Sequence, residues 1–119
     1  MTVYTEGAHP AEFILSEANG NRSRDNGTLK SGQNLTAGTV VQFDADTKLV
    51  VFDGTRDSGG GLDPQAAGIL LYDGNASSGD LAVSYIARDA EVNVNLITFP
   101  ALHQDDTVAS LKTLGIVAR

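Results

Sequence analysis

The chain has 119 residues, no cysteine, no tryptophan and a formal net charge of −7. A chain of this length is expected to form one domain, and without cysteine it has no disulfide framework, thiolate nucleophile or cysteine-based zinc site, which suits folding in the cytosol of the producing cell. The negative charge repels phosphate backbones, and no apolar run approaches the ~20 residues that span a bilayer, so we expect neither nucleic acid nor a membrane as a partner.

The first 30 residues contain mostly polar and small side chains around one apolar cluster, Phe-Ile-Leu, at residues 13–15. No helical or alternating period is present there, and no second strand follows by a short turn. We therefore predict a flexible N-terminal arm over residues 1–30 and a β-rich core domain over residues 31–119. An idle tail or an edge strand within the same fold is the alternative, but an exposed apolar strand promotes aggregation, which favours a binding role.

Two apolar, β-rich segments follow the arm, over residues 35–43 and 48–54. Between them lie Asp44 and Asp46, whose side chains can accept hydrogen bonds from nearby backbone amides in a turn. This pattern predicts a β-hairpin. The next segment, residues 55–65, holds three successive glycines and a proline and is expected to be a surface loop.

A second hairpin is predicted from the segments AAGILLYDG (66–74) and LAVSYIAR (81–88), which the turn-like NASSGD separates. The first segment has the continuous apolar character of a buried strand. In the second, Leu81, Val83 and Tyr85 fall on one face because side chains alternate along a strand.

The segment EVNVNLITF, residues 91–99, is expected to be a half-buried strand. Apolar residues at 92, 94 and 96 alternate with Asn93 and Asn95, so one face should pack on the core while the other faces water or a polar partner.

A short amphipathic helix is predicted over residues 104–115, because Val108, Leu111 and Leu114 recur at roughly helical spacing. Asp105 or Asp106 can cap its first turn, and Gly115 can supply a left-handed C-cap. The last four residues are expected to return to the core as an extended piece. The predicted fold class is thus mainly β (α+β), a single small barrel-like domain with one short C-terminal helix and a flexible N-terminal arm.

Candidate catalytic and metal sites are weak in this sequence. The loop from Asp73 begins like a calcium-binding loop, but its sixth and twelfth positions are Ser78 and Ser84 rather than glycine and glutamate. His9 and His103 are the two histidines, and no nucleophile-elbow motif accompanies them. We therefore expect no enzymatic activity, no metal and no cofactor.

The blocks that carry a family resemblance are AEFILSEANGNRSRD, GQNLTAGTVVQ, KLVVFDGTRD, AAGILLYD and YIARDAEVNVNLITFP. In this order and spacing they resemble the lambda-type head decoration proteins of tailed bacteriophages, the capsid-stabilising protein D family. The resemblance implies a β-clip fold and a homotrimer that binds the major capsid protein on the outer surface of the expanded head. It also implies that the trimers occupy three-fold and quasi-three-fold positions of the virion and reinforce the shell against packaged DNA.

The resemblance further implies that the N-terminal arm is disordered in the free protein and orders on the shell. By match, the capsid-binding arm includes Tyr4, His9, Pro10, Phe13, Ile14 and Leu15. The chain differs from the lambda protein in a longer segment at residues 16–34 and an inserted GGGLDPQ loop, which affects the expected footprint on the shell.

The alternative function is a small β-rich module that binds a glycan or another polymer through the face of Asn93 and Asn95. The absence of tryptophan is unfavourable for this alternative, because such sites commonly use exposed aromatic rings.

Overall fold

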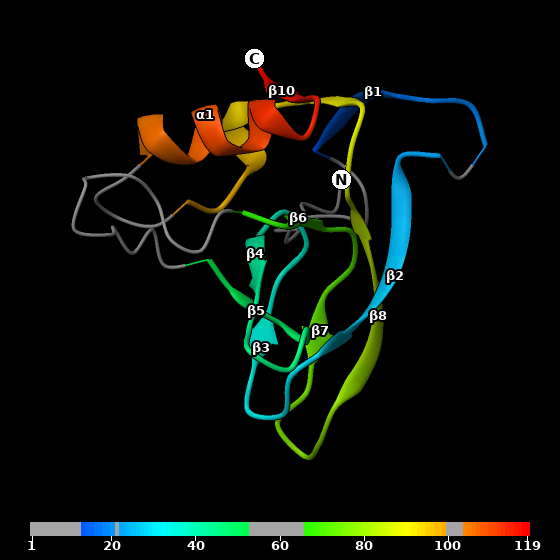
Figure 1. The fold of residues 1–119 in the computed structure, drawn as a ribbon, viewed down its shortest axis with the longest axis vertical. Coiled ribbons are helices and arrows are strands. Elements are labelled where there is room, and N and C mark those ends of the chain that lie inside the picture. Colours follow the sequence, from blue (N-terminus) through cyan, green and yellow to red (C-terminus); the bar gives the residue numbers. More distant parts are fainter. Residues whose placement is uncertain (1–12, 21, 53–65, 100–103) are drawn as a thin grey trace, which may run out of the picture.

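The computed structural model describes residues 13–20, 22–52, 66–99 and 104–119. These residues form a mainly β domain with one α-helix, as the sequence predicts (Figure 1). The elements are β1 (Ile14–Glu17), β2 (Arg24–Leu29), β3 (Asn34–Leu35), β4 (Val40–Phe43), β5 (Leu49–Val51), β6 (Gly68–Leu70), β7 (Gly74–Asn75), β8 (Leu81–Ile86), β9 (Ala90–Val92), the 3₁₀ turn η1 (Val94–Leu96), α1 (Gln104–Thr113) and β10 (Ile116–Ala118).

The strands assemble into a closed barrel and a separate three-stranded sheet. The barrel has the order β2-β5-β4-β6-β8, and the sheet has the order β1-β9-β10. A short antiparallel pair, β3 with β7, lies beside them. Figure 1 shows α1, β1 and β10 together at one end of the molecule, while β2 and β8 run side by side away from that end.

Two hydrophobic cores share the strands of the barrel. Val40 and Ile69 pack in a core with α1 and the three-stranded sheet, whereas their neighbours Val41 and Leu70 pack in the core inside the barrel. Adjacent side chains of a strand point to opposite faces, so β4 and β6 are buried on both faces. This explains the continuous apolar run of residues 69–71.

Both predicted hairpin pairings are confirmed. Strand β4 pairs antiparallel with β5, and the turn between them is closed by Asp44, whose Oδ1 accepts hydrogen bonds from the amides of Asp46 and Lys48, each at 2.9 Å. Strand β6 pairs antiparallel with β8, with Leu70 opposite Tyr85. The connection from β6 to β8 also contributes β7.

Three C-terminal predictions are confirmed as well: the helix, its glycine C-cap and the extended last residues. Helix α1 packs Leu111, which is fully buried, into the first core, while Val108 and Leu114 are half-buried. Gly115 adopts a φ of +80°, a left-handed conformation that ends the helix. Strand β10 then pairs parallel with β9. In the described part of the chain no helix is long and apolar enough to cross a membrane.

The predicted strand over residues 91–99 is wrong beyond Val92. The chain leaves β9 there and enters η1, because the side-chain oxygen of Asn93 accepts a hydrogen bond from the amide of Asn95 at 3.0 Å. This local cap competes with the strand conformation that the alternating pattern favours. Leu96 is consequently 38% exposed instead of facing a core.

Part of the flexible arm predicted over residues 1–30 instead forms strands of the fold, and β1 is the edge strand that the sequence analysis gave as the alternative. Strand β1 pairs antiparallel with β9, and β2 pairs with β8 over its whole length. Both pairings join residues more than fifty positions apart in the sequence, so no short turn between neighbouring segments predicts them. Residues 1–12 of the predicted arm, His9, His103 and the loop 55–65 lie outside the described residues.

Candidate interaction surface

The edge of the three-stranded sheet is formed by β1. Strand β9 lies between β1 and β10, so within the described residues one side of β1 carries no strand. The pairing places Ile14 opposite Val92 but Ser16 opposite Glu91, which leaves Leu15 as an extra residue. A bulge of this kind removes a residue from the ladder and redirects its side chain.

The bulge decides which of the predicted arm residues faces outward. Phe13 is only 2% exposed and belongs to the first core, and its carbonyl oxygen accepts a hydrogen bond from the amide of Asn93 at 2.7 Å. Ile14 is half-buried against the same core, whereas Leu15 is 55% exposed. The structure therefore separates Leu15, at the surface, from Phe13, in the core. Tyr4, His9 and Pro10 lie outside the described residues.

A second apolar surface, here named the β8 groove, lies along β8. It is an open groove of about 350 Å³ lined by Asn26, Tyr72, Asp73, Leu81, Ala82, Val83 and Ser84. Tyr72 and Leu81 are large apolar side chains with substantial exposure. Such a surface patch on a small protein is typical of a binding site.

Two polar contacts shape the β8 groove. Ser84 Oγ donates to Asn26 Oδ1 at 2.9 Å across the β2–β8 pair, and Asp73 Oδ1 accepts the amide of Ala37 at 2.8 Å. The sequence analysis missed this groove. The sequence feature that pointed to it is the strand face that Leu81 shares with Tyr85. Leu81 is exposed at one end of this face, and Tyr85 is buried at the other. The Tyr85 ring meets the Phe43 ring edge-to-face, with 6.3 Å between ring centroids.

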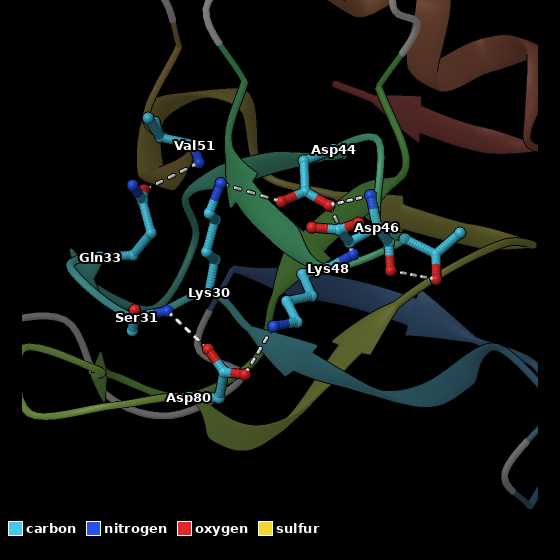
Figure 2. Close-up of polar contacts among 9 residues, drawn as sticks. Lys30, Ser31, Gln33, Asp44, Asp46, Lys48, Val51 and Asp80 are labelled. Carbon is cyan, nitrogen blue, oxygen red and sulfur yellow. Dashed lines mark hydrogen bonds and ion pairs between the residues drawn. The ribbon is translucent and has the colours of Figure 1, made fainter.

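A ring of polar contacts ties together three connections of the barrel (Figure 2). We name it the barrel-end network: Lys30, Ser31, Asp44, Lys48 and Asp80. Lys30 Nζ lies 3.3 Å from Asp44 Oδ2, and Lys48 Nζ lies 2.8 Å from Asp80 Oδ2. Asp80 Oδ1 accepts the amide of Ser31 at 2.9 Å, and Asp44 Oδ1 accepts the amide of Lys48, which closes the ring.

The barrel-end network shifts the ionisation of its members. The pKa of Asp44 is lowered, first by the hydrogen bond from the Lys48 amide and further by the Asp46 amide and Lys30. The pKa of Asp80 is lowered by the Lys48 ammonium and by the Ser31 amide, and the same ion pair raises the pKa of Lys48. Each carboxylate is thus held in its charged form.

The network gives Asp44 the turn-capping role that the sequence predicts. In the described residues no group of three or more His, Asp or Glu side chains is arranged to hold a metal ion. The strand face of Asn93 and Asn95 that was considered for glycan binding is not formed. Asn93 instead caps η1, and its Oδ1 accepts the amide of Asn95.

An ion pair also fastens the two strands that flank the first described turn. Arg24 donates to Glu17 through Nε at 3.0 Å and through Nη2 at 2.7 Å, a two-pronged contact between β2 and β1. The hydrogen bonds from Arg24 lower the pKa of Glu17. A paired guanidinium and carboxylate of this geometry fixes the position of β1 relative to the barrel.

A small β domain that presents an apolar residue at an open sheet edge, and an apolar groove on its barrel, has the features of a structural protein that binds other protein surfaces. A comparison with protein families makes this specific: the family described as bacteriophage lambda head decoration protein D matches residues 3–116 of the 119. The chain therefore belongs to this family of phage head proteins, which confirms the resemblance. No curated protein gives a significant match.

Proposed function

We propose that the protein is a non-enzymatic capsid decoration protein that binds as a homotrimer to the outer surface of the expanded phage head. It occupies three-fold and quasi-three-fold positions, contacts the major capsid protein and stabilises the shell against packaged DNA. The observation that carries the proposal is the family match over residues 3–116. Synthesis takes place in the host cytoplasm, and the finished protein resides on the virion.

The edge of β1 supports the proposed contact with the shell. An open sheet edge can accept a strand of a partner, with main-chain hydrogen bonds giving affinity and side chains giving specificity. Leu15 is exposed at this edge, and only Phe13 and Ile14 separate it from residues 1–12, which hold Tyr4, His9 and Pro10. We propose that these four residues contact the capsid, while Phe13 and Ile14 anchor the contact to the core.

Trimer formation and shell binding support one another energetically in this proposal. Each hydrogen bond contributes only ~1 kcal/mol net, and each residue that becomes ordered costs ~1–2 kcal/mol of backbone entropy, so one arm binds weakly. Three linked arms bind at high effective concentration once the first is seated, which raises avidity ~100-fold or more. Shell subunits bridged in this way must lose several contacts together before they separate.

The β8 groove is proposed as the contact between copies of the chain. Each copy carries a net charge of −7, so copies meet most favourably through faces with little charge. Among the groove residues only Asp73 is charged, and its carboxylate is engaged with the Ala37 amide. Burial of Tyr72 and Leu81 would supply the hydrophobic contribution.

The proposal is tested by mixing the purified protein with expanded shells that lack it, and measuring bound protein by co-sedimentation. A chain that begins at Phe13 and the variant Leu15→Glu should both bind at least about tenfold more weakly, because the arm contacts are lost or repelled. Val51→Glu, which changes an exposed valine of β5, is the matched control and should bind normally. Equal binding by all four proteins contradicts the assigned contact.

A further inference from the structure

Two Asn-Gly pairs occur in the chain, Asn19–Gly20 and Asn26–Gly27. In an Asn-Gly pair the glycine nitrogen can approach the asparagine side-chain carbonyl closely, because glycine has no Cβ and is conformationally permissive. The two pairs therefore have the same intrinsic chemistry. The structure places them in different surroundings.

The first pair lies at the tip of the turn between β1 and β2. Asn19 and Gly20 are both exposed, and Gly20 has a φ of +68° with no atom within 4 Å of the position a Cβ would occupy. Within the described residues no hydrogen bond is found from the Gly20 amide or to the Asn19 side chain. Nothing in this part of the chain restrains Asn19 from turning its side chain toward the Gly20 nitrogen.

The base of the same turn is fixed. Ser23 is fully buried; its Oγ accepts the Ala18 amide at 3.0 Å and donates to the Asp89 carbonyl at 2.7 Å. The ion pair between Glu17 and Arg24 spans the two strands next to it. The tip can thus change its covalent structure while the strands remain in place.

The second pair lies in the middle of β2. Asn26 is opposite Ser84, whose Oγ donates to Asn26 Oδ1 at 2.9 Å. The Ala87 amide donates to the Ser23 carbonyl at 2.8 Å, and because hydrogen-bonded pairs alternate along an antiparallel ladder, Gly27 opposite Val83 also occupies a hydrogen-bonded position. The Gly27 nitrogen is therefore engaged, and the extended main chain holds it away from the Asn26 side-chain carbon.

We propose that Asn19 is a site of spontaneous deamidation, from which β2 protects Asn26. The Gly20 backbone nitrogen loses its proton to water or hydroxide and attacks Cγ of Asn19. A bond forms between the Gly20 nitrogen and Cγ, the Cγ–Nδ2 bond breaks as Nδ2 takes up a proton from water and leaves as ammonia, and a succinimide ring results. Water then opens the ring at one of its two carbonyls and gives either aspartate or isoaspartate.

The product changes the turn that follows β1, the strand that carries Leu15. It adds a carboxylate to a chain that already carries −7, and the isoaspartate form lengthens the main chain by one carbon between β1 and β2. Because the Ser23 and Arg24 contacts hold the base of the turn, we expect the folded core and its thermal stability to remain nearly unchanged.

The test uses the intact protein, incubated at mildly alkaline pH and digested with trypsin. Cleavage after Arg22 and Arg24 puts Asn19 and Asn26 in different peptides, and fragment masses distinguish Asn19 from Asn21. In the folded protein Asn19 should convert at least about tenfold faster than Asn26, because Asn26 reacts only when the ladder opens. In guanidinium chloride both should convert at similar rates.

Two further measurements complete the test. An isoaspartyl methyltransferase should label the incubated protein, and Asn19→Gln should abolish that labelling without changing the melting temperature. The proposal is overturned if Asn26 converts as fast as Asn19 in the folded protein. It is equally overturned if Asn19 keeps its amide when folded but loses it in denaturant.

Discussion

Lys48 and Asp80 join two connections of the barrel, with 2.8 Å between Lys48 Nζ and Asp80 Oδ2. The same carboxylate accepts the amide of Ser31 through its other oxygen. Ser31 follows β2, Lys48 precedes β5 and Asp80 precedes β8. One carboxylate therefore fixes three segments that are distant in sequence, and it does so without a disulfide.

Replacing Asp80 separates its two contacts. Asp80→Asn retains an oxygen for the Ser31 amide but removes the ion pair, whereas Asp80→Ala removes both, so we expect melting temperatures to fall in the order native, Asp80→Asn, Asp80→Ala. The side chains of Lys48 and Asp80 are 36% and 41% exposed, so the first step should be small and should shrink at high salt. Scanning calorimetry at two salt concentrations measures both effects, and a salt-independent loss would contradict an ion pair.

The loss of stability at acidic pH should depend on the carboxylates of Asp44 and Asp80. The pKa values of Asp44 and Asp80 are lowered in the folded protein, so their contribution is present above the unfolded value of ~3.9 and is lost as pH falls through the folded values. These two carboxylates should therefore contribute to a fall in melting temperature below about pH 4. Asp44→Asn should make that fall in melting temperature smaller. The carboxylate of Asp46 forms no hydrogen bond or ion pair with another described residue, so Asp46→Asn should leave the fall unchanged.

Phe13 and Leu15 should differ sharply in their effect on folding. Phe13 is buried in the first core, so Phe13→Ala should lower the free energy of unfolding by about 3–5 kcal/mol. Leu15 is 55% exposed at the bulge, so Leu15→Ala should change it by no more than ~0.5 kcal/mol. Chemical denaturation monitored by circular dichroism provides both values. A small effect at both positions would mean that β1 does not belong to the folded core.

Gly68 is required because β6 and β8 approach closely at this point. A Cβ on Gly68 would lie 2.1 Å from the carbonyl oxygen of Ile86, so Gly68→Ala should destabilise the protein by about 3 kcal/mol. Gly79 is a matched control, because its φ of +155° is close to the +158° of Gly68 while no atom lies within 4 Å of its added Cβ. Equal losses in the two variants, measured by urea denaturation, would show that the contact with Ile86 is not responsible.

The β8 groove can be tested through the mass of the protein in solution. If the protein forms the proposed trimer through this groove, Leu81→Glu places a charge in the groove of every copy and should dissociate the proposed trimer to folded monomers. Val51→Glu introduces the same charge at an exposed position outside the groove and should leave the trimer intact. Sedimentation equilibrium distinguishes these results, and a trimeric Leu81→Glu protein would move the subunit contact elsewhere.

Local signals were sufficient for several elements of this fold. The Asp44 turn, the spacing of Val108 and Leu111 in α1, and the left-handed Gly115 each depend on residues a few positions apart. Their chemistry determines their conformation with little help from the rest of the chain. These are the elements that the sequence analysis predicted correctly.

Non-local pairing explains what the sequence analysis missed. Strand β2 reads RDNGTL, with few residues that favour strands, and it forms because β8 offers a complete ladder on one side and β5 continues the barrel on the other. Strand β1 likewise depends on β9. The exposure of Leu15 follows from a bulge that becomes definable only when the partner strand is known.

The most direct test of the proposed function is a cryo-electron microscopy reconstruction of expanded heads that lack the decoration protein, after addition of the purified chain. We predict trimeric density on the outer surface at three-fold and quasi-three-fold positions, with the β1 end of each subunit toward the shell. Heads that stay bare, or density from single copies with β1 directed away from the shell, would contradict this prediction.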